Sequence, residues 1–143
     1  DLYNNKIVQI PKEIGAMNNL QTIMMGSQGS ERNQITEIPI QIGQLKKLKK
    51  IHLGNNKISS IPIELKNCKS LKELTLWNNE FTEIPTWLEE MKLDELNFFH
   101  NKIKKLPDDY KWLENIRNLT LDFHLDEEMK LKKKKKLKWT FWK

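Results

Sequence analysis

The chain of 143 residues lacks most of the features by which enzymes and membrane proteins are recognised from sequence. Its single cysteine, Cys68, excludes a disulfide within the chain. It contains no G-x-x-x-x-G-K phosphate loop, no G-x-S-x-G nucleophile motif and no Cys–His pairing that would activate a thiol. No apolar run approaches the roughly 18 residues that a membrane helix needs. We therefore expect a protein that is not an enzyme.

Apolar residues are also scarce, at 38%, whereas 31% of the residues are charged. An average globular domain has about 45–50% apolar residues, so this composition suits a thin repeat protein in which each unit buries only a stripe. The net charge of +6 is unevenly distributed, because residues 126–143 contain eight lysines against three acidic residues. The rest of the chain is close to neutral, and the basic character belongs to its end.

What the sequence does contain is a repeated phrase of about 23 residues, L-x-x-L-x-L-x-x-N-x-I-x-x-I-P-x-x-I-x-x-L-x-x. A period of this length is typical of a solenoid of stacked coils. The first step between copies is longer because of an insertion at 26–32, whose Gly and Ser residues predict a loop. A partial copy starts at Leu2, and the successive copies begin at Leu20, Leu48, Leu71, Leu93 and Ile116.

Each copy combines a strand signal with a helix signal. The L-x-x-L-x-L segment alternates apolar and polar residues as a half-buried strand does, and stacked strands about 4.8 Å apart form a parallel sheet. The proline that follows suits the first turn of a short helix. We therefore predict an α/β fold over residues 1–125: a solenoid with a parallel concave sheet and short helical or 3-10 returns on the convex side. The residues of the returns expected to point inward are Ile42, Leu65, Leu88 and Leu113.

Two further slots of the repeat are predicted to be structural. Cys68 lies in a slot filled elsewhere by Met17, Leu45, Met91 and Leu113, so we interpret it as a buried small hydrophobic residue. An asparagine recurs just after each strand, and its amide both donates and accepts hydrogen bonds, so a column of asparagines can satisfy buried turns. The predicted ladder consists of Asn5, Asn33, Asn56, Asn79 and Asn101, and it ends where His124 replaces asparagine.

These phrases resemble the leucine-rich repeats of the 23-residue L-P-x-x-I-G-x-L class. The stretch from Ile10 to Thr22 is most similar to the repeats of pathogenic spirochaetes such as Leptospira, and the resemblance extends from Leu2 to about Leu121. It implies a bacterial protein that is secreted or on the cell surface and engages host proteins, with a cytoplasmic location left open. Because the chain begins within a repeat, at Asp1, we interpret it as a processed or trimmed product, with a removed export signal left open.

Residues 126–143 are predicted to cap the C-terminal end of the solenoid. Asp126 would open a short charged helix that runs to Leu137, with acidic residues in its first turn and lysines in its last. An aromatic strand from Trp139 to Trp142 would follow, an arrangement similar to the ends of the bacterial proteins named above. The alternative is a disordered basic arm that binds an anionic membrane surface or nucleic acid through Lys130–Lys143.

The strand positions between the buried aliphatic residues should form a solvent-facing concave surface. Trp77 and Phe99 occupy the same slot of adjacent copies on it, and exposed paired aromatics often mark a protein contact, although scattered exposed hydrophobic residues are ordinary. We predict a protein partner of unknown identity rather than a small-molecule substrate. The predicted contact residues are Trp77, Phe99, His52, Glu73, Thr75, Glu95, Asn97 and His100.

Two other kinds of interaction are considered. The three histidines, His52, His100 and His124, lie on different copies and do not converge as zinc ligands must, so we predict no metal and no cofactor. The N-terminal edge, formed by Leu2–Tyr3 and the strand at 20–25, has no visible cap. Because an uncovered strand edge offers unpaired backbone groups to another chain, we predict a tendency to self-associate there.

Overall fold

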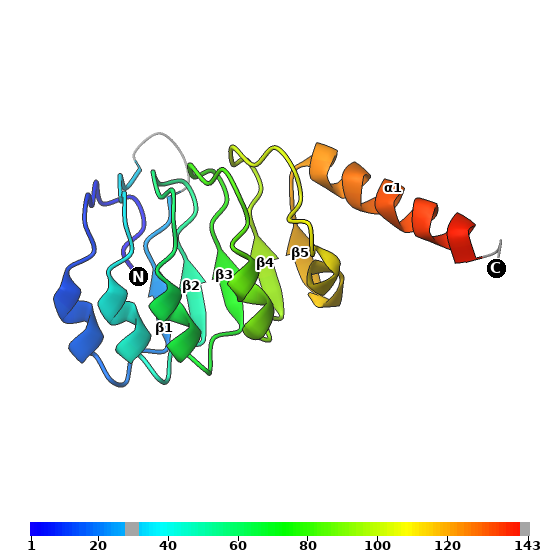
Figure 1. Cartoon of the computed structure of the whole chain (residues 1–143). Helices are drawn as coiled ribbons and strands as arrows, with labels where there is room; N and C mark the ends of the chain where they lie inside the picture. The colour runs from blue at the N-terminus through cyan, green and yellow to red at the C-terminus, as the bar shows by residue number, and fades with distance from the viewer. Residues whose placement is uncertain (28–31, 141–143) are drawn as a thin grey trace.

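The chain folds into a row of stacked coils followed by one long helix (Figure 1). The computed structural model describes residues 1–27 and 32–140, with the backbone alone described for 135–140. The strands of this part of the chain are β1 (Thr22–Met24), β2 (Lys50–His52), β3 (Glu73–Thr75), β4 (Glu95–Asn97) and β5 (Asn118–Thr120). Its 3-10 helices are η1 (Lys12–Ala16), η2 (Ile40–Gln44), η3 (Ile63–Asn67), η4 (Thr86–Glu90) and η5 (Lys111–Asn115), and the helix α1 (Phe123–Thr140) follows them.

The strands form one parallel sheet in chain order, and the 3-10 helices line the opposite side of the coils (Figure 1). The register pairs equal positions of the repeat, for example Lys50 with Glu73 and Glu73 with Glu95. The central residue of a strand, such as Ile51 or Leu74, is fully buried, because successive side chains of a strand point to opposite faces. The predicted solenoid with a parallel sheet and 3-10 returns is therefore confirmed.

Prolines position the first four returns. Pro11, Pro39, Pro62 and Pro85 each stand directly before a 3-10 helix in an extended conformation, with φ between −67° and −61°. The proline ring fixes this angle before the chain enters the helical turn. The inward-pointing residues predicted for the returns, Ile42, Leu65, Leu88 and Leu113, are all buried.

The fifth return departs from the predicted register. η5 begins at Lys111 rather than directly after Pro107, and its first turn is preceded by Tyr110. The N–H of Ile116 donates to the carbonyl of Leu113, as the N–H of Met91 donates to that of Leu88. Counted from the return, Ile116 is therefore equivalent to Met91. Counted from the sheet, where Leu119 aligns with Leu96 and Leu74, the buried Leu113 keeps the slot of Cys68 that the sequence assigned to it. The extra residues after Pro107 explain the shift.

The core of the described residues is a single column of mostly aliphatic side chains that also includes Phe81, Phe98 and Trp112. Phe81 and Phe98 are fully buried and pack edge to face, with ring centroids 5.1 Å apart. Cys68 is 1% exposed, and its thiol donates to the carbonyl oxygen of Ile42 at 3.1 Å. Burial raises the pKa of the Cys68 thiol. Cys68 therefore behaves as the buried hydrophobic residue that the sequence predicts, because the reactive form of a cysteine is the thiolate.

The asparagines after the strands join each coil to the one before it. Asn56 accepts from the N–H of Ile35 at 3.0 Å and donates to the carbonyls of Met25 and Leu53, both at 3.0 Å. Asn79 repeats the pattern one coil later, with the N–H of Ile58 as its donor at 2.9 Å. Asn33, Asn56 and Asn79 are buried, so these amides satisfy backbone groups that water does not reach.

At the C-terminal end, side chains take over the hydrogen bonds that a further coil would make. The carbonyl of Phe81 accepts from the N–H of Lys102 in the next coil, whereas the carbonyl of Ile103 accepts from Nε2 of His124 at 2.9 Å. Asp122 accepts from the N–H of His100 at 2.9 Å. His124 therefore occupies the asparagine column but makes a different hydrogen bond. Its ring donates to a carbonyl that the backbone N–H of a further coil would otherwise contact.

Among the described side chains, those of α1 contact the last coil as far as Lys133, which pairs with Glu114 at 3.3 Å, and Lys132 lies over the ring of Tyr110. Leu125 is fully buried and Glu128 accepts from the N–H of Leu106 at 3.0 Å, whereas Leu131 is 55% exposed. Burial alone would raise the pKa of Glu128, but the hydrogen bonds from Lys132 and from the Leu106 N–H lower it. Beyond this contact the helix extends away from the coils (Figure 1).

The end of the chain differs from the predicted helix and strand. α1 starts at Phe123 instead of Asp126, and it continues through Trp139 and Thr140, where the sequence predicted a strand to begin. The segment has no Gly or Pro and is rich in Lys and Leu, which are good helix formers, so nothing in it stops the helix. Phe141 and Trp142, the rest of the predicted strand, lie outside the described residues.

The N-terminal coil presents apolar side chains in slots that are buried elsewhere. Leu2 is 44% exposed and Met17 is 54% exposed, whereas the equivalent residues Leu53 and Leu45 are buried. The N–H of Leu2 donates to the carbonyl of Met24 at 2.7 Å and so extends the sheet beyond β1. Self-association at this face stays a prediction. None of the helices in the described part of the chain has both the length and the apolar character that a membrane crossing requires.

Replacing Asn56 with alanine should lower the free energy of unfolding by roughly 2–4 kcal/mol, because buried backbone groups on two coils lose their partners. Urea denaturation followed by circular dichroism measures the loss. Asn5→Ala is the matched control: Asn5 is an exposed member of the same column, and among the described residues its side chain donates only to Tyr3. Its loss should stay below about 1 kcal/mol. Equal losses for the two variants would contradict a supporting role of the ladder.

Candidate functional site

The concave surface is built from rows of side chains that the parallel register aligns. One row contains Lys50, Glu73 and Glu95, and the next contains His52, Thr75 and Asn97. The slot just past the strand forms a third row, since the N–H of Asn78 donates to the carbonyl of Phe99 at 2.7 Å. Side chains of one row therefore stand on neighbouring strands, as the sequence predicted.

Trp77 and Phe99 lie side by side in this third row but differ in exposure. The indole of Trp77 lies against Gly54 of the preceding coil, where a Cβ atom would clash with the ring, and Trp77 is half-buried. Phe99 is 39% exposed and its ring packs on that of His100, with centroids 4.2 Å apart. We call Trp77 and Phe99 the aromatic patch. Its first member is held by the solenoid and its second stands toward solvent.

Charged residues next to the aromatic patch form one tight pair. Lys50 lies 2.8 Å from a carboxylate oxygen of Glu73, and Nε2 of His52 lies 3.6 Å from the other. The hydrogen bond from Lys50 lowers the pKa of Glu73, and the neighbouring His52 acts in the same direction. Among the described residues, Glu95 has no cationic partner, and only the hydroxyl of Thr75 approaches its carboxylate, at 3.4 Å.

Two of the predicted contact residues are placed differently from what the sequence indicated. Thr75 is only 8% exposed, because its short side chain stands between the longer His52 and Asn97 on the adjacent strands. It can orient Glu95, but it offers little surface to a partner. Asn97 is half-buried and its Oδ1 accepts from the N–H of Phe99 at 3.0 Å, so it holds the backbone of the aromatic patch.

A second row of polar residues on the turn was not identified from the sequence. Asn55 accepts from Asn78 at 2.7 Å and from Arg32 at 3.1 Å, which links three coils one position before the predicted ladder. Asn55 and Asn78 have φ of 60° and 49°, in the left-handed region that asparagine tolerates. His100 occupies the same slot with φ of 56°. The Asn-Asn pairs at 55–56 and 78–79 are the sequence feature from which this second row could have been predicted.

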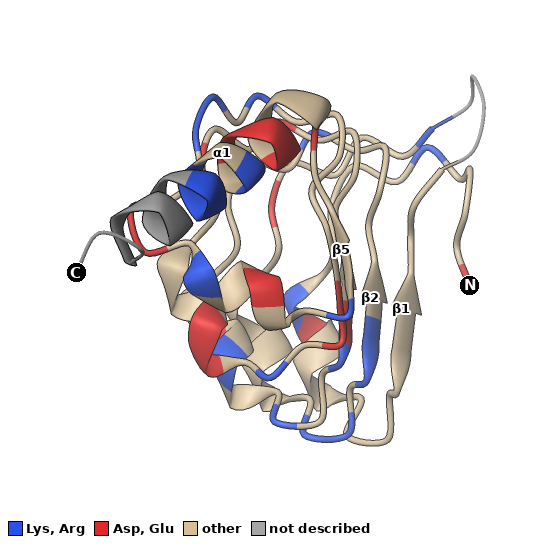
Figure 2. Cartoon of the chain, turned by 90° about the vertical axis from the view of Figure 1, so that its right-hand side faces the viewer, with Lys and Arg blue, Asp and Glu red and all other residues tan. Residues whose placement is uncertain are grey.

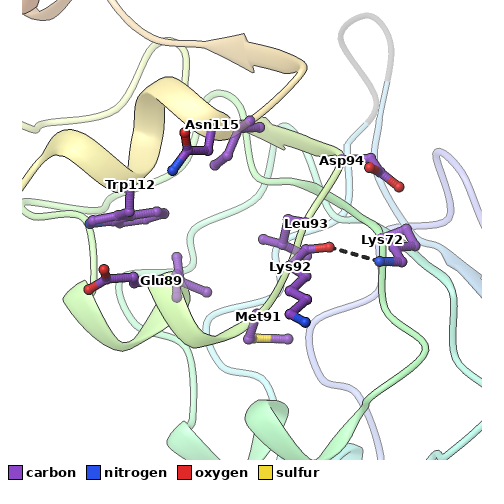
Figure 3. A pocket seen from close by; sticks show the side chains of 10 residues that line it. Lys72, Glu89, Met91, Lys92, Leu93, Asp94, Trp112 and Asn115 are labelled. Carbon is purple, nitrogen blue, oxygen red and sulfur yellow. Dashed lines mark hydrogen bonds between the residues drawn. The ribbon is translucent and has the colours of Figure 1, made fainter.

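A cleft of about 430 Å³ opens on the convex side between η4 and η5. Trp112 and Glu89 lie on one side of it and Leu93 and Lys92 on the other (Figure 3). Trp112 is buried, and its Nε1 has no hydrogen-bond partner among the described residues. No group of three or more described His, Cys, Asp or Glu residues could hold a metal ion.

Comparisons with known proteins identify the fold. Residues 46–89 match the family model described as Leucine Rich repeats (2 copies). A Leptospira interrogans LRR protein is similar in structure with a TM-score of 0.68 and 34% identity, over 81% of this chain and 29% of that chain. None of the curated proteins matches the sequence. The parallel sheet and 3-10 returns are therefore those of the leucine-rich-repeat fold.

Two further solved structures are also similar. The crystal structure of PEPR1–AtPEP1 matches with a TM-score of 0.67 and 30% identity, over 85% of this chain and 17% of that chain. The ectodomain of the Arabidopsis thaliana receptor kinase GASSHO1/SCHENGEN3, in complex with CASPARIAN STRIP INTEGRITY FACTOR 2, matches with a TM-score of 0.63 and 31% identity, over 85% and 18%. The chain thus spans less than a third of each of the three similar chains.

Replacing Lys50 with alanine should raise the pKa of Glu73 toward its ordinary value, because the hydrogen bond that favours the carboxylate is lost. A folded pKa below the unfolded one stabilises the fold above the unfolded pKa, and this contribution is lost as the pH falls through the folded pKa. Lys50→Ala should therefore reduce the part of the acid sensitivity that Glu73 causes, and His52 would maintain the remainder. NMR titration of the glutamate side-chain carbons measures the pKa.

Lys57→Ala is the control for this titration, because Lys57 is an exposed lysine that bonds to the amide of Gln34 and not to a carboxylate. It should leave the pKa of Glu73 unchanged. If Glu73 titrates alike in the wild type and in Lys50→Ala, the pair at 2.8 Å is not maintained in solution.

Proposed function

We propose that this chain is a protein-recognition module that holds its partner on the concave surface around the aromatic patch. The observation that carries the proposal is the placement of Trp77 and Phe99 in the same slot of adjacent coils, outside the core. Aromatic side chains bury a large area at a low cost in side-chain entropy, and a few of them usually dominate a protein interface. A rigid sheet that presents two neighbouring rings favours binding of another protein over chemistry.

The support beneath the rings strengthens the proposal. Trp77 lies against Gly54, and Phe99 is oriented by Asn97 and His100. Both rings are therefore ordered before a partner arrives, which reduces the entropy that binding must overcome. Glu73 and Glu95 lie four residues before Trp77 and Phe99 on the same coils, and His52 lies on the neighbouring strand. These three side chains would form the polar rim of the contact.

The similar structures agree with a recognition role. The two structures described last are the complex PEPR1–AtPEP1 and a plant receptor-kinase ectodomain in complex with CASPARIAN STRIP INTEGRITY FACTOR 2. The likeness to a Leptospira protein supports a finer proposal, that this chain is an exported bacterial protein whose partner is a host protein. On this proposal the chain acts outside the cell or at its surface, and it acts without catalysis.

Removing the aromatic patch should abolish partner binding without unfolding the chain. We expect the variant Trp77→Ala/Phe99→Ala to lose the partners that the wild type captures, with affinity reduced at least 30-fold, or roughly 2 kcal/mol, as at other aromatic hot spots. Gly54→Ala should weaken binding as well, because the added Cβ displaces the indole of Trp77. Quantitative mass spectrometry of captured proteins and titration of the identified partner measure both effects.

The chain offers a matched control for this test. Ile40 and Ile63 are also apolar residues in the same slot of adjacent coils, each 56% exposed, but they lie on the 3-10 returns. The variant Ile40→Ala/Ile63→Ala should keep every interaction. If it loses the same partners, or if Trp77→Ala/Phe99→Ala keeps them, the concave surface is not the binding site.

A second candidate function is favoured by the extension of α1 beyond the coils. Figure 2 shows acidic residues at the start of the helix and lysines after them. Lys130 and Lys132 form ion pairs with Glu127 and Glu128, whereas Lys134 is exposed. The lysine-rich end of the chain would then bind an anionic membrane surface or nucleic acid, as a further contact of the same recognition module.

If α1 has this function, binding to vesicles that contain phosphatidylserine should fall steeply as salt increases, and a chain that ends at Met129 should not bind. Truncation there keeps the buried Leu125 and the Glu128 contact with Leu106. It removes the ion pairs of Lys132 with Glu128 and of Lys133 with Glu114, which are exposed pairs worth about 0–1 kcal/mol each, so the solenoid should melt at only a slightly lower temperature. Phosphatidylcholine vesicles are the control, and duplex DNA is the parallel probe for nucleic acid. Binding that is insensitive to salt, or that persists after truncation, would exclude this role.

A further inference from the structure

The concave surface carries an incomplete row of charges next to the aromatic patch. Lys50, Glu73 and Glu95 stand on three successive strands in register. Lys50 neutralises Glu73 at 2.8 Å, but no described cation lies within ion-pair distance of Glu95. Like charges on directly neighbouring strand positions repel each other. The charge therefore changes sign from Lys50 to Glu73 but not from Glu73 to Glu95.

A cation from outside would complete this row. Glu73 and Glu95 are both partly exposed, so an approaching group can reach their oxygens from the concave side. The hydroxyl of Thr75 approaches one carboxylate oxygen of Glu95 and thereby helps to orient this carboxylate. A guanidinium has the planar fork of donors that two neighbouring carboxylates can share, whereas an ammonium is a point charge.

The spacing between this row and the aromatic patch sets a second requirement. Trp77 and Phe99 follow Glu73 and Glu95 by four residues on the same coils. With an extended backbone, this separates the carboxylates from the rings by roughly 13 Å. A partner that fills both regions must present a basic and an apolar side chain at about this distance, on the same side of its own backbone.

We propose that the partner recognised by this concave surface is a protein segment that carries an arginine and, four residues away in an extended conformation, an apolar or aromatic residue. The arginine binds between Glu73 and Glu95, and the apolar residue packs on the aromatic patch. This inference rests on the proposed function, because it names the chemistry of the partner at that same surface. The local acidity stands out in a chain whose net charge is +6, so charge complementarity at this place selects a basic segment.

Selection of random peptides displayed on phage tests the chemistry directly. Peptides enriched by the wild type should contain arginine, or less often lysine, four positions from an aromatic or aliphatic residue. The affinity of a synthetic peptide of the enriched sequence should fall roughly tenfold or more for Glu95→Gln, which keeps the size of the side chain and the contact with Thr75. The charge reversal Glu95→Lys should enrich acidic peptides instead.

Separate outcomes bear on this inference and on the proposed function. Peptides that need Trp77 and Phe99 but carry no basic residue, and whose affinity Glu95→Gln leaves unchanged, would overturn the inference and leave the proposed function standing. Acidic peptides bound by the wild type through Lys50 would overturn it in the same way. Peptides that bind Trp77→Ala/Phe99→Ala as tightly as the wild type would refute both.

Glu64→Gln is the control for a general effect of charge, because Glu64 lies on the return η3, away from the concave sheet. It should leave the affinity of the enriched peptide within about twofold, as expected for a carboxylate that does not contact the peptide. Thermal melting of each variant shows that the coils stay folded. An equal loss of affinity in Glu64→Gln and Glu95→Gln would contradict a contact between the arginine and Glu95.

Discussion

The hydrogen bonds of the asparagine ladder are the interaction on which this structure depends. A coil of about two dozen residues turns twice and leaves backbone N–H and C=O groups inside the turn, where water does not reach them. The amides of Asn33, Asn56 and Asn79 satisfy these groups and do so across the boundary between coils. The same bonds therefore complete one coil and fix the distance and rotation of the next. Once this register is fixed, the side chains between the buried aliphatic residues form continuous rows, and the concave surface follows.

That constraint also explains what was predictable from the sequence. A slot that must bury its residue, such as that of Leu53 or Leu76, tolerates few residue types and is visible in the repeat. The rows that contain Glu73, Glu95 and the aromatic patch could be derived by counting positions from those slots. The burial of Thr75 could not, because it depends on how far the side chains of His52 and Asn97 reach across the strands, and the repeat does not constrain them.

The other differences between the prediction and the structure lie where the sequence departs from the repeat or where the repeat does not determine the conformation. The second row of turn residues, Asn55 and Asn78, was present as Asn-Asn pairs, but the function of its first asparagine depends on a left-handed backbone that only the structure reveals. η5 moves because extra residues follow Pro107, and the sequence does not say whether a loop or a helix absorbs them. Likewise, α1 runs past Trp139 because local helix propensity prevails in a segment that contains no helix-breaking residue.

The last coil shows how the solenoid separates support from recognition. His124 and Asp122 hydrogen-bond the backbone groups that another coil would have satisfied, and Glu128 accepts from the N–H of Leu106 beside them. These side chains close the end of the row and are then no longer available to a partner. The aromatic patch shows the same division within a single row. Gly54 leaves room for the indole of Trp77 to lie against the preceding coil, where Trp77 is partly buried. Phe99 does not lie against a glycine in this way and remains more exposed. Trp77 therefore gives the surface its rigidity, and Phe99 offers the area that a partner can still cover.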